Sequence, residues 1–251
     1  MCLVLFAFQP GAPHPLVVAA NRDEFYARPA LAAHFWDEHP DVLGGRDLEA
    51  GGTWLGVHRS GRFAAVTNFA EAGPDAAPAS RGQLTEAFLR GTSDALAYAR
   101  AIDSSAYRGF NLILYDGRSL VYRSSLTPPV QLDAGVYGLA NAELGARWPK
   151  VVRGETALES ALNPGTDIAS ERLLALLADN SQPPDNVLPR RGKPLETERQ
   201  VAPCFINGKE YGTRASTVVL IGERHLSFTE QAYLAEGRRG ERVTFNFPLG
   251  S

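Results

Sequence analysis

Two neighbouring stretches decide how this chain folds: MCLVLFAF at residues 1–8 and VVAANRDEFYARP at residues 17–29. The first is a short apolar run that ends at a Pro-Gly turn signal, a pattern typical of a buried strand. A second apolar run predicts a strand over residues 16–20 and a hairpin between the two. Antiparallel pairing would bring the polar residues 21–24, Asn-Arg-Asp-Glu, back beside Cys2. A buried strand needs neither a cysteine at its start nor such a cluster, whereas a catalytic site could use both.

The composition is that of an ordinary globular protein, and it excludes several classes. The 251 residues are 44% hydrophobic and 21% charged, and the net charge of −3 gives no basic footprint for nucleic acid or an anionic membrane. No apolar run approaches the roughly 18 residues that span a bilayer, and the start lacks the basic region of a signal peptide. We therefore expect a cytoplasmic protein with a small-molecule substrate or ligand, no nucleic-acid partner and no integral membrane segment.

The sequence gives little support for a metal or another cofactor. Cys2 and Cys204 are the only cysteines, CxxC and HExxH patterns are absent, and the five histidines are scattered. The tripeptide Asp-Glu-His at residues 37–39 could ligate a metal, but a metal site needs further ligands at the right spacing, so a solvated loop is the favoured interpretation. We expect no cofactor and no metal ligands.

The remaining pattern predicts further hairpins and a set of helices. Strand pairs are expected at residues 54–57 with 63–67, 110–115 with 119–123, and 213–221 with 225–233, and single strands at 136–140 and 243–247. Helices are expected from an N-cap at Ser80 to residue 89, from Thr92 or Ser93 to about residue 101, and over residues 148–162 and 167–178.

Residues 182–203 are rich in Pro, Arg and Glu and have no periodicity, so we expect a mobile lid or edge loop that borders a cleft. The strands come in hairpin pairs without strand–helix alternation. This order favours an α+β class with antiparallel sheets and segregated helices.

Cys2 could act as a nucleophile if Met1 is removed, as is common before a small residue. Its free α-amine, with a reference pKa of about 7.7–8.0, would then accept the thiol proton, and no separate histidine would be needed. A nearby Arg22 would raise the thiolate fraction. The plainer alternative is that Cys2 is a small buried hydrophobe at the start of a strand and that Arg22 forms a surface salt bridge with Asp23 or Glu24.

Several stretches together resemble one family. They are MCLVLFAF, AANRDEFYARP, GRDLEAGGTWLGV, VTNFAE, SRGQLT, LANAELGARWPK and YGTRASTVVL, in order from residue 2 to about residue 220. The set is similar to the NRDE family, also called the transport and Golgi organisation protein 2 family. The resemblance implies an N-terminal nucleophile (Ntn) hydrolase-like fold, which is a four-layer αββα sandwich of two antiparallel sheets. It also implies that residues 1–251 form a single domain.

A more distant resemblance, to choloylglycine hydrolases and cysteine-type penicillin acylases, implies catalytic roles. Arg22, Asn68, Asn141 and, loosely, Arg214 match positions of those enzymes. In those enzymes an Asp lies three residues after the first Arg, and the residue at that position of this chain is Phe25. The acid of this chain would therefore be Asp23 or Glu24. This position of the acid departs from the pattern of those enzymes, and the orientation of the α-amine depends on it.

The implied roles are physically reasonable. Side-chain NH2 groups of Asn68 and Asn141 could stabilise an oxyanion, and each such donor is worth about 2.7–4 kcal/mol in other enzymes. An Asn that caps a turn is the alternative for both. Arg214 falls within a predicted strand, where a charge is costly unless it is paired, so a site or a buried ion pair is favoured.

Glu24, Trp54 and Phe69 are the candidate substrate-binding residues. Trp54 follows Gly51-Gly52-Thr53, whose glycines permit a positive φ or a close backbone approach. Core packing is the slightly favoured alternative for the Trp54 side chain.

Two functions follow from this pattern. The first is a cysteine Ntn hydrolase that cleaves a linear amide C–N bond of a small acyl substrate through an acyl-enzyme. The alternative is a non-catalytic lipid, acyl-CoA or haem handling protein on the same scaffold, because a fold does not fix a function. In a haem-handling protein, Cys2 or a histidine could serve as axial ligand.

Overall fold

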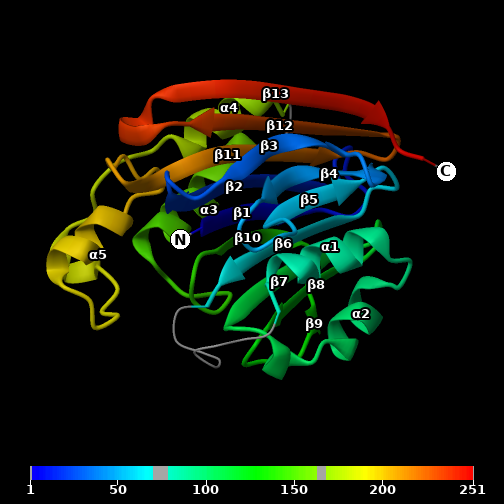
Figure 1. Cartoon of the computed structure of the whole chain (residues 1–251), viewed down its shortest axis with the longest axis horizontal. Coiled ribbons are helices and arrows are strands. Elements are labelled where there is room, and N and C mark those ends of the chain that lie inside the picture. The colour runs from blue at the N-terminus through cyan, green and yellow to red at the C-terminus, as the bar shows by residue number, and fades with distance from the viewer. Residues whose placement is uncertain (1, 70–78, 163–167, 251) are drawn as a thin grey trace.

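The computed structural model describes residues 2–69, 79–162 and 168–250, and their strands form two antiparallel sheets (Figure 1). We call them sheet A and sheet B. The predicted removal of Met1 and the predicted helix start at Asp167 concern residues outside these ranges.

Sheet A contains both chain regions from which the sequence argument started. Its strand order is β10-β1-β2-β11-β12-β13. The strands are β1 (Cys2–Phe8), β2 (Leu16–Phe25), β10 (Gly135–Leu139), β11 (Tyr211–Ile221), β12 (His225–Tyr233) and β13 (Arg239–Pro248). The predicted hairpin of β1 and β2 is confirmed.

Sheet B lies against sheet A and has the strand order β3-β4-β5-β6-β7-β8-β9. The strands are β3 (Ala30–Trp36), β4 (His39–Asp47), β5 (Leu55–His58), β6 (Phe63–Asn68), β7 (Phe110–Tyr115), β8 (Leu120–Ser124) and β9 (Val130–Gln131). The sequence did not predict β3 and β4. Residues 37 and 38 form the exposed turn between them, and His39 is the first residue of β4.

The helices follow the predicted order. They are α1 (Gly82–Arg90), α2 (Ala95–Ala101), α3 (Pro149–Ala161), α4 (Ser170–Leu177) and α5 (Leu195–Val201), with short 3-10 turns at Ser104–Ala106, Asp185–Val187 and Ala235–Gly237. The predicted cap of α2 was wrong by one or two residues: Asp94 caps this helix by accepting a hydrogen bond from the amide of Ala97 at 2.7 Å. No helix among the described residues is long and apolar enough to cross a bilayer.

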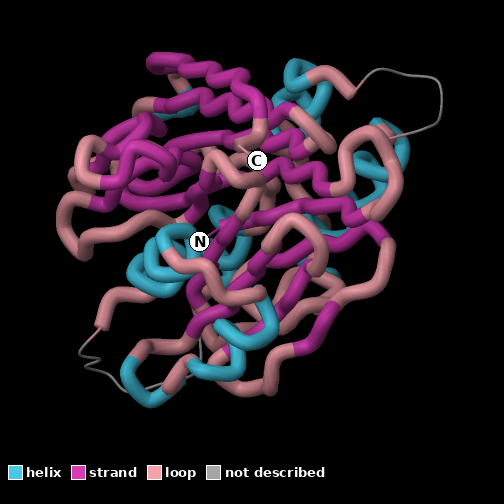
Figure 2. Tube along the Cα trace, turned by 90° about the vertical axis from the view of Figure 1, so that its right-hand side faces the viewer, coloured by secondary structure: helices cyan, strands magenta, loops and turns pink. Residues whose placement is uncertain are grey.

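Three apolar clusters show that the layers stack as αββα. One cluster fills the space between the sheets, a second lies between sheet A and the helices α3 and α4, and a third lies between sheet B and the helices α1 and α2. Figure 2, turned by 90° from Figure 1, shows strand segments of both sheets with the helices in cyan. The αββα sandwich expected from the resemblance is thus confirmed.

The position of β1 in this stack explains its continuous apolar sequence. Val4 and Phe6 face sheet B, while Leu3 and Leu5 face the helix layer, and all four are fully buried. A strand covered on both faces cannot alternate between apolar and polar residues. The same alternation decides where the polar end of β2 points, because Arg22 shares a face with Ala20 and Val18, whereas Asn21 and Asp23 share the other.

The prediction for residues 182–203 was wrong in two respects. The stretch contains the helix α5, and none of its residues lines the large cavity described below. It packs instead against the start of α3. Glu198 is buried and forms an ion pair with Arg191, whose guanidinium lies 5.0 Å from the ring centroid of Trp148. This pair and the aromatic contact give a polar, proline-rich segment an anchor that composition alone did not reveal.

Candidate active site

Cys2 lies at the edge of a cavity of about 480 Å³ between the two sheets. In the antiparallel register of β1 and β2 it is opposite Arg22, and Leu3 is opposite Asn21. Cys2 shares the face of β1 that carries Val4 and Phe6, and its side chain is half-buried. The hairpin therefore brings the polar cluster beside the cysteine, as the sequence predicted.

The cavity collects most of the predicted site residues. Its lining includes Cys2, Arg22, Asp23, Glu24, Trp54, Asn68 and Arg214. The two remaining candidates, Asn141 and Phe69, are not among the lining residues. Within the described ranges, no group of three or more His, Cys, Asp or Glu side chains is placed to hold a metal ion.

Asn141 contacts Cys2 directly. The backbone nitrogen of Cys2 donates a hydrogen bond to Oδ1 of Asn141 at 3.1 Å, and Nδ2 of Asn141 donates to the carbonyl of Asn68 at 2.8 Å. The amide group of Asn141 thus holds the main chain of β1 against the end of β6. The Asn68 side chain is exposed to the cavity, and its neighbour Phe69 contributes its backbone nitrogen to a 2.9 Å hydrogen bond with the carbonyl of Gly109.

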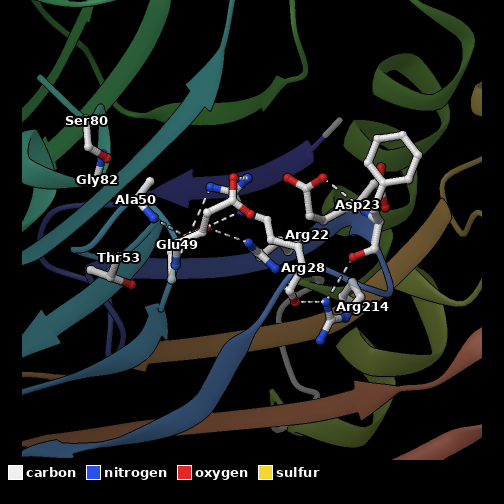
Figure 3. A network of polar contacts seen from close by, with 12 residues as sticks. Arg22, Asp23, Arg28, Glu49, Ala50, Thr53, Ser80, Gly82 and Arg214 are labelled. Carbon is white, nitrogen blue, oxygen red and sulfur yellow. Dashed lines mark hydrogen bonds and ion pairs between the residues drawn. The ribbon is translucent and has the colours of Figure 1, made fainter. Parts of the chain in front are cut away.

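Arg22 is held by Asp47, which the sequence analysis did not single out. Asp47 accepts a hydrogen bond from Arg22 at 3.0 Å and two from Arg28, at 2.7 and 3.1 Å (Figure 3). It also accepts from the backbone nitrogens of Glu49 and Ala50. Although burial alone would raise the pKa of Asp47, the hydrogen bonds from Arg28 and Ala50 and the charge of Arg22 hold it below its usual range.

Arg214 occupies a bulge in β11. The pairing of β11 with β2 shifts between Thr213 and Ala215, so Arg214 is the extra residue. Its Nη1 donates to the carbonyls of Phe25 and Arg28 at 3.0 and 2.6 Å (Figure 3). The bulge therefore turns an arginine out of the strand ladder and uses it to fix the turn that carries Arg28.

Asp23 faces the helix layer and is buried. Its Oδ1 accepts a hydrogen bond from Oγ1 of Thr213 at 2.8 Å. Burial raises the pKa of Asp23, and the positive charge of Lys150 opposes that shift. Lys150, on α3, is itself buried and donates to the carbonyl of Val201 at 3.2 Å; burial lowers its pKa, and Asp23 opposes this. The two groups stabilise each other's charged forms beneath the β1–β2 hairpin.

Asn21 has a structural position. Its Nδ2 donates to the carbonyls of Leu177 and Cys204, both at 2.9 Å, and its Oδ1 accepts from Oγ of Ser216 at 2.6 Å. The side chain of Asn21 is fully buried, so these hydrogen bonds take the place of those that it would form with water in the unfolded chain. Strand alternation thus gives neighbouring residues of the NRDE stretch different positions. The side chain of Asn21 joins β2 to the helix layer, and the side chain of Arg22 lines the cavity.

The surroundings of Cys2 disfavour its thiolate form. Burial raises its pKa, and the charge of Asp23 acts in the same direction, whereas the charge of Arg22 and the backbone amide of Asp23 lower it. A thiol in this setting needs a base before it can attack.

Gly51 and Gly52 behave as the sequence predicted, since both have φ of +71°. A Cβ at Gly52 would lie 2.5 Å from the carbonyl carbon of Gly82, so the glycine also permits a close approach to the start of α1. The following Trp54 is half-buried. It packs against the apolar cluster between the sheets, as the core interpretation expected, and it also lines the cavity, while its role in substrate binding stays a prediction.

Sequence reasoning missed Arg28, Asp47, Arg81 and Lys150. Each lies inside a stretch that carried the family resemblance, YARP, GRDLEAGG, SRGQLT and RWPK respectively. The signal that could have identified them is a charged residue at or near the end of an element, beside a proline or glycine in the case of Arg28, Arg81 and Lys150, where side chains of different elements meet.

Comparison with solved structures defines the class of fold. The chain aligns with an N-acylethanolamine-hydrolyzing acid amidase ortholog of Caenorhabditis elegans at a TM-score of 0.52 and 10% identity, over 87% of this chain and 92% of that one. It aligns with the C2A mutant of a conjugated bile acid hydrolase from Clostridium perfringens at a TM-score of 0.54 and 8% identity, over 98% and 92%. The fold is that of the Ntn hydrolases.

Sequence comparison gives the family. The protein belongs to the transport and Golgi organisation 2 family, whose model matches residues 1–235. It is 36% identical to the Transport and Golgi organization protein 2 homolog of Bos taurus and 33% identical to that of Homo sapiens, in both cases over the full length of both chains. The Drosophila melanogaster protein is 28% identical, over 96% of this chain and 95% of its own length.

Proposed function

We propose that this protein is a cysteine Ntn hydrolase that cleaves the linear amide C–N bond of a small acyl substrate, with Cys2 as nucleophile. The observation that carries the proposal is the position of Cys2. It lines a cavity large enough for a small organic molecule, and its backbone nitrogen is held by Asn141 at 3.1 Å. That nitrogen becomes the α-amine once Met1 has been removed.

The amine supplies the base that the thiol needs. Burial raises the thiol pKa, so attack requires removal of the proton, and the amine of the same residue is a group that can take it. The hydrogen bond to Asn141 Oδ1 uses one amine hydrogen and orients the nitrogen. Asp23 is buried behind the strand, where burial raises its pKa and the charge of Lys150 opposes that shift. In its ionised form it would stabilise the protonated amine.

The proton moves in two cycles. In the first, the thiol proton passes to the amine as sulfur bonds to the amide carbon, and the amine then gives it to the leaving nitrogen as the C–N bond breaks. This leaves a thioester. In the second, water gives a proton to the amine as its oxygen bonds to the acyl carbon, and the C–S bond breaks with return of that proton to sulfur. The Asn68 side chain, exposed at the cavity, is a candidate donor to the oxyanion in both cycles.

The test compares four forms of the protein against a panel of fluorogenic acyl amides of increasing chain length. They are the form that begins at Cys2, a form with an uncleaved N-terminal extension, Cys2→Ser and Cys2→Ala. We expect activity in the first, a loss of at least about a hundredfold in the second, residual activity in the third and none in the fourth. Equal thermal unfolding midpoints control for folding.

Two outcomes would contradict the proposal. An extended form as active as the first would exclude the amine as base. If all four forms are inactive across the panel and haem titration gives a Soret band that Cys2→Ala removes, the protein handles haem and does not hydrolyse amides.

A further inference from the structure

The cavity has two ends, which the strand order of the sheets defines. Strand β1 contacts β6, and β12 contacts β3. In sheet A, β2 and β11 separate β1 from β12; in sheet B, β4 and β5 separate β6 from β3. One end of the cavity is therefore the Cys2 end, where β1 faces β6. The other is the β3–β12 end.

The β3–β12 end carries apolar side chains among charged ones. Its apolar lining is Ala30, Leu31 and Ala32 of β3, Ala232 of β12 and Leu234 just after it. Of the charged residues at this end, Arg46 pairs with Glu38 and Glu230 binds the backbone of Ala33, while Glu241 also lines the cavity. Leu31 is 48% exposed and Leu234 is 50% exposed, although both side chains are large and apolar. Apolar surface that stays open inside a concave site favours an apolar ligand group.

Beyond the Cys2 end lie two cavity-lining arginines, Arg81 and Arg108. Arg81 directly precedes α1 and is half-buried, and its Nη1 donates to the carbonyl of Gly109 at 3.1 Å. The same carbonyl accepts from the backbone nitrogen of Phe69, so the guanidinium is held next to the end of β6. Arg108 is the chain neighbour of Gly109. Burial lowers the pKa of Arg81 and the charge of Arg108 acts in the same direction.

The pairing of the cavity arginines separates these two from three of the others. Arg22, Arg28 and Arg46 also line the cavity, and each has an ion pair with a carboxylate of the chain. Arg214 lines the cavity without an ion pair among the described residues, but its Nη1 donates to the carbonyls of Phe25 and Arg28 and so fixes that turn. Within residues 2–69, 79–162 and 168–250, Arg81 and Arg108 take part in none of the ion pairs. Two like charges beside each other, one of them half-buried, are unfavourable unless an anion joins them. A guanidinium fork suits a carboxylate, phosphate or sulfonate.

We propose that the cavity binds an amphipathic acyl amide lengthwise. The acyl chain occupies the β3–β12 end, the amide carbon lies at Cys2, and an anionic group on the amine side of the bond is held by Arg81 and Arg108. The reaction part of this inference rests on the proposed hydrolase function, whereas the binding part does not. The ligand class is therefore an acyl chain joined through an amide to a small anionic amine, such as an amino acid.

The test measures binding to the Cys2→Ala protein, which cannot turn the ligand over. N-dodecanoylglycine and its neutral glycinamide counterpart differ only in the charge of the amine side, and we expect the carboxylate to bind at least about tenfold more tightly by calorimetry. Arg81→Gln should reduce this ratio to near one, Arg108→Gln should reduce it partly, and Arg81→Lys should keep part of it.

Arg90→Gln is the matched control. Arg90 lies on α1, outside the cavity lining, and pairs with Glu86 on the helix surface, so its loss removes the same charge and leaves the ratio unchanged. A second ligand tests the orientation: a neutral amide of dodecanedioic acid carries its carboxylate at the acyl end and should gain nothing from Arg81.

The outcomes separate this inference from the proposed function. Equal affinity for the charged and neutral ligands, or a preference that survives Arg81→Gln, overturns the anion site. If Arg81→Gln does not fold, the ligand comparison in the parent and Arg108→Gln decide alone. If the carboxylate ligand binds more tightly but the form that begins at Cys2 hydrolyses no amide, the hydrolase function is rejected and the anion site is kept. If neutral amides are hydrolysed but the carboxylate ligand has no binding advantage, the anion site is rejected and the hydrolase function is kept.

Discussion

The backbone nitrogen of Cys2 donates a hydrogen bond to Oδ1 of Asn141 at 3.1 Å, across 139 positions of the sequence. Asn141 follows β10, which pairs with β1 on the side away from β2. The start of β1 is therefore held from both sides, by Asn141 from the β10 side and by the register with Arg22 from the β2 side. This double support positions the residue on which the proposed reaction depends.

Asn141→Ala removes the acceptor for the Cys2 nitrogen and the donor to the carbonyl of Asn68. We expect kcat for amide hydrolysis to fall about a hundredfold, since a reacting group displaced by about 1 Å costs roughly that factor. Steady-state kinetics with a fluorogenic amide measures this. Asn246→Ala, at an exposed position of β13, is the control and should keep the parent rate. An unaltered rate in Asn141→Ala would exclude a positioning role.

The two thiols should differ in reactivity. Burial raises the pKa of Cys204 to about 12, and its Sγ also donates to the carbonyl of Leu177 at 3.6 Å. Burial raises the pKa of Cys2 as well, but this side chain lines the cavity and a reagent can reach it. Mass spectrometry of native protein treated with iodoacetamide at pH 8 should find Cys2 alkylated first. In the control Cys204→Ala, Cys2 should be alkylated at the same rate as in the parent protein. Faster labelling of Cys204 would falsify the assignment of Cys2 as the reactive thiol.

Asp47→Asn should weaken the acid dependence of stability. The folded-state pKa of Asp47 lies below its unfolded value, so its carboxylate stabilises the fold above the unfolded pKa, and this contribution disappears as pH falls through the folded pKa. We expect the variant to lose about 1–2 kcal/mol of unfolding free energy at pH 7 and the two proteins to converge toward pH 3.

Urea unfolding at pH 7, 5 and 3 measures this convergence. Asp41→Asn is the control, because Asp41 is exposed and its contact with Arg59 is a 3.5 Å surface pair. A stability gap that stays constant across the pH range would show that the loss comes from the shape of the turn and not from the charge of Asp47.

Glu230→Gln should have the opposite pH dependence. Glu230 is buried on β12, where Oε1 accepts from the backbone nitrogen of Ala33 at 2.7 Å and so joins β12 to β3. Burial raises its pKa, although Arg22 and His34 oppose the shift. The folded state then favours the protonated form, and stability is lost as pH rises from the unfolded value of about 4.3 through the folded pKa.

The glutamine variant lacks this loss. Its free energy of unfolding relative to the parent should therefore rise between pH 4 and pH 8, by an amount on the order of 1 kcal/mol. Urea titrations of both proteins at each pH measure the difference. A relative stability that falls with pH would contradict the direction of the pKa shift.

The sequence predicted those parts of the fold that depend on neighbouring residues, such as apolar runs and turn residues. The β1–β2 hairpin follows from two apolar runs around a Pro-Gly turn, and the β7–β8 hairpin from Asp116-Gly117, where Gly117 has φ of +96°. Strands β3 and β4 lack such a pattern. Their pairing shifts register between Leu31 and His34 and again between Phe35 and Trp36, and these irregularities break the alternation that identifies a strand.

The same distinction between local and long-range contacts holds for the candidate site. Strand pairing alone predicted that Arg22 lies beside Cys2. The partners of Arg22 and Asp23 could not be predicted, because Asp47 comes from the end of β4 and Lys150 from α3, and only the stacking of layers brings them close. Residues 182–203 lie against the start of α3 and outside the cavity, through contacts such as Arg191 with Trp148 and Val201 with Lys150 that composition does not show. That residues 1–251 form a single domain stays a prediction.

The most direct test of the central claim is intact-mass analysis of the protein that begins at Cys2, after brief exposure to an activated acyl ester and an acid quench. A Cys2 nucleophile predicts a single acyl adduct that peptide mapping places on Cys2, that hydroxylamine removes, and that the Cys2→Ala form does not acquire. The form with an N-terminal extension should acquire it at least about tenfold more slowly. An adduct that maps elsewhere, or that forms equally in Cys2→Ala, would contradict the account.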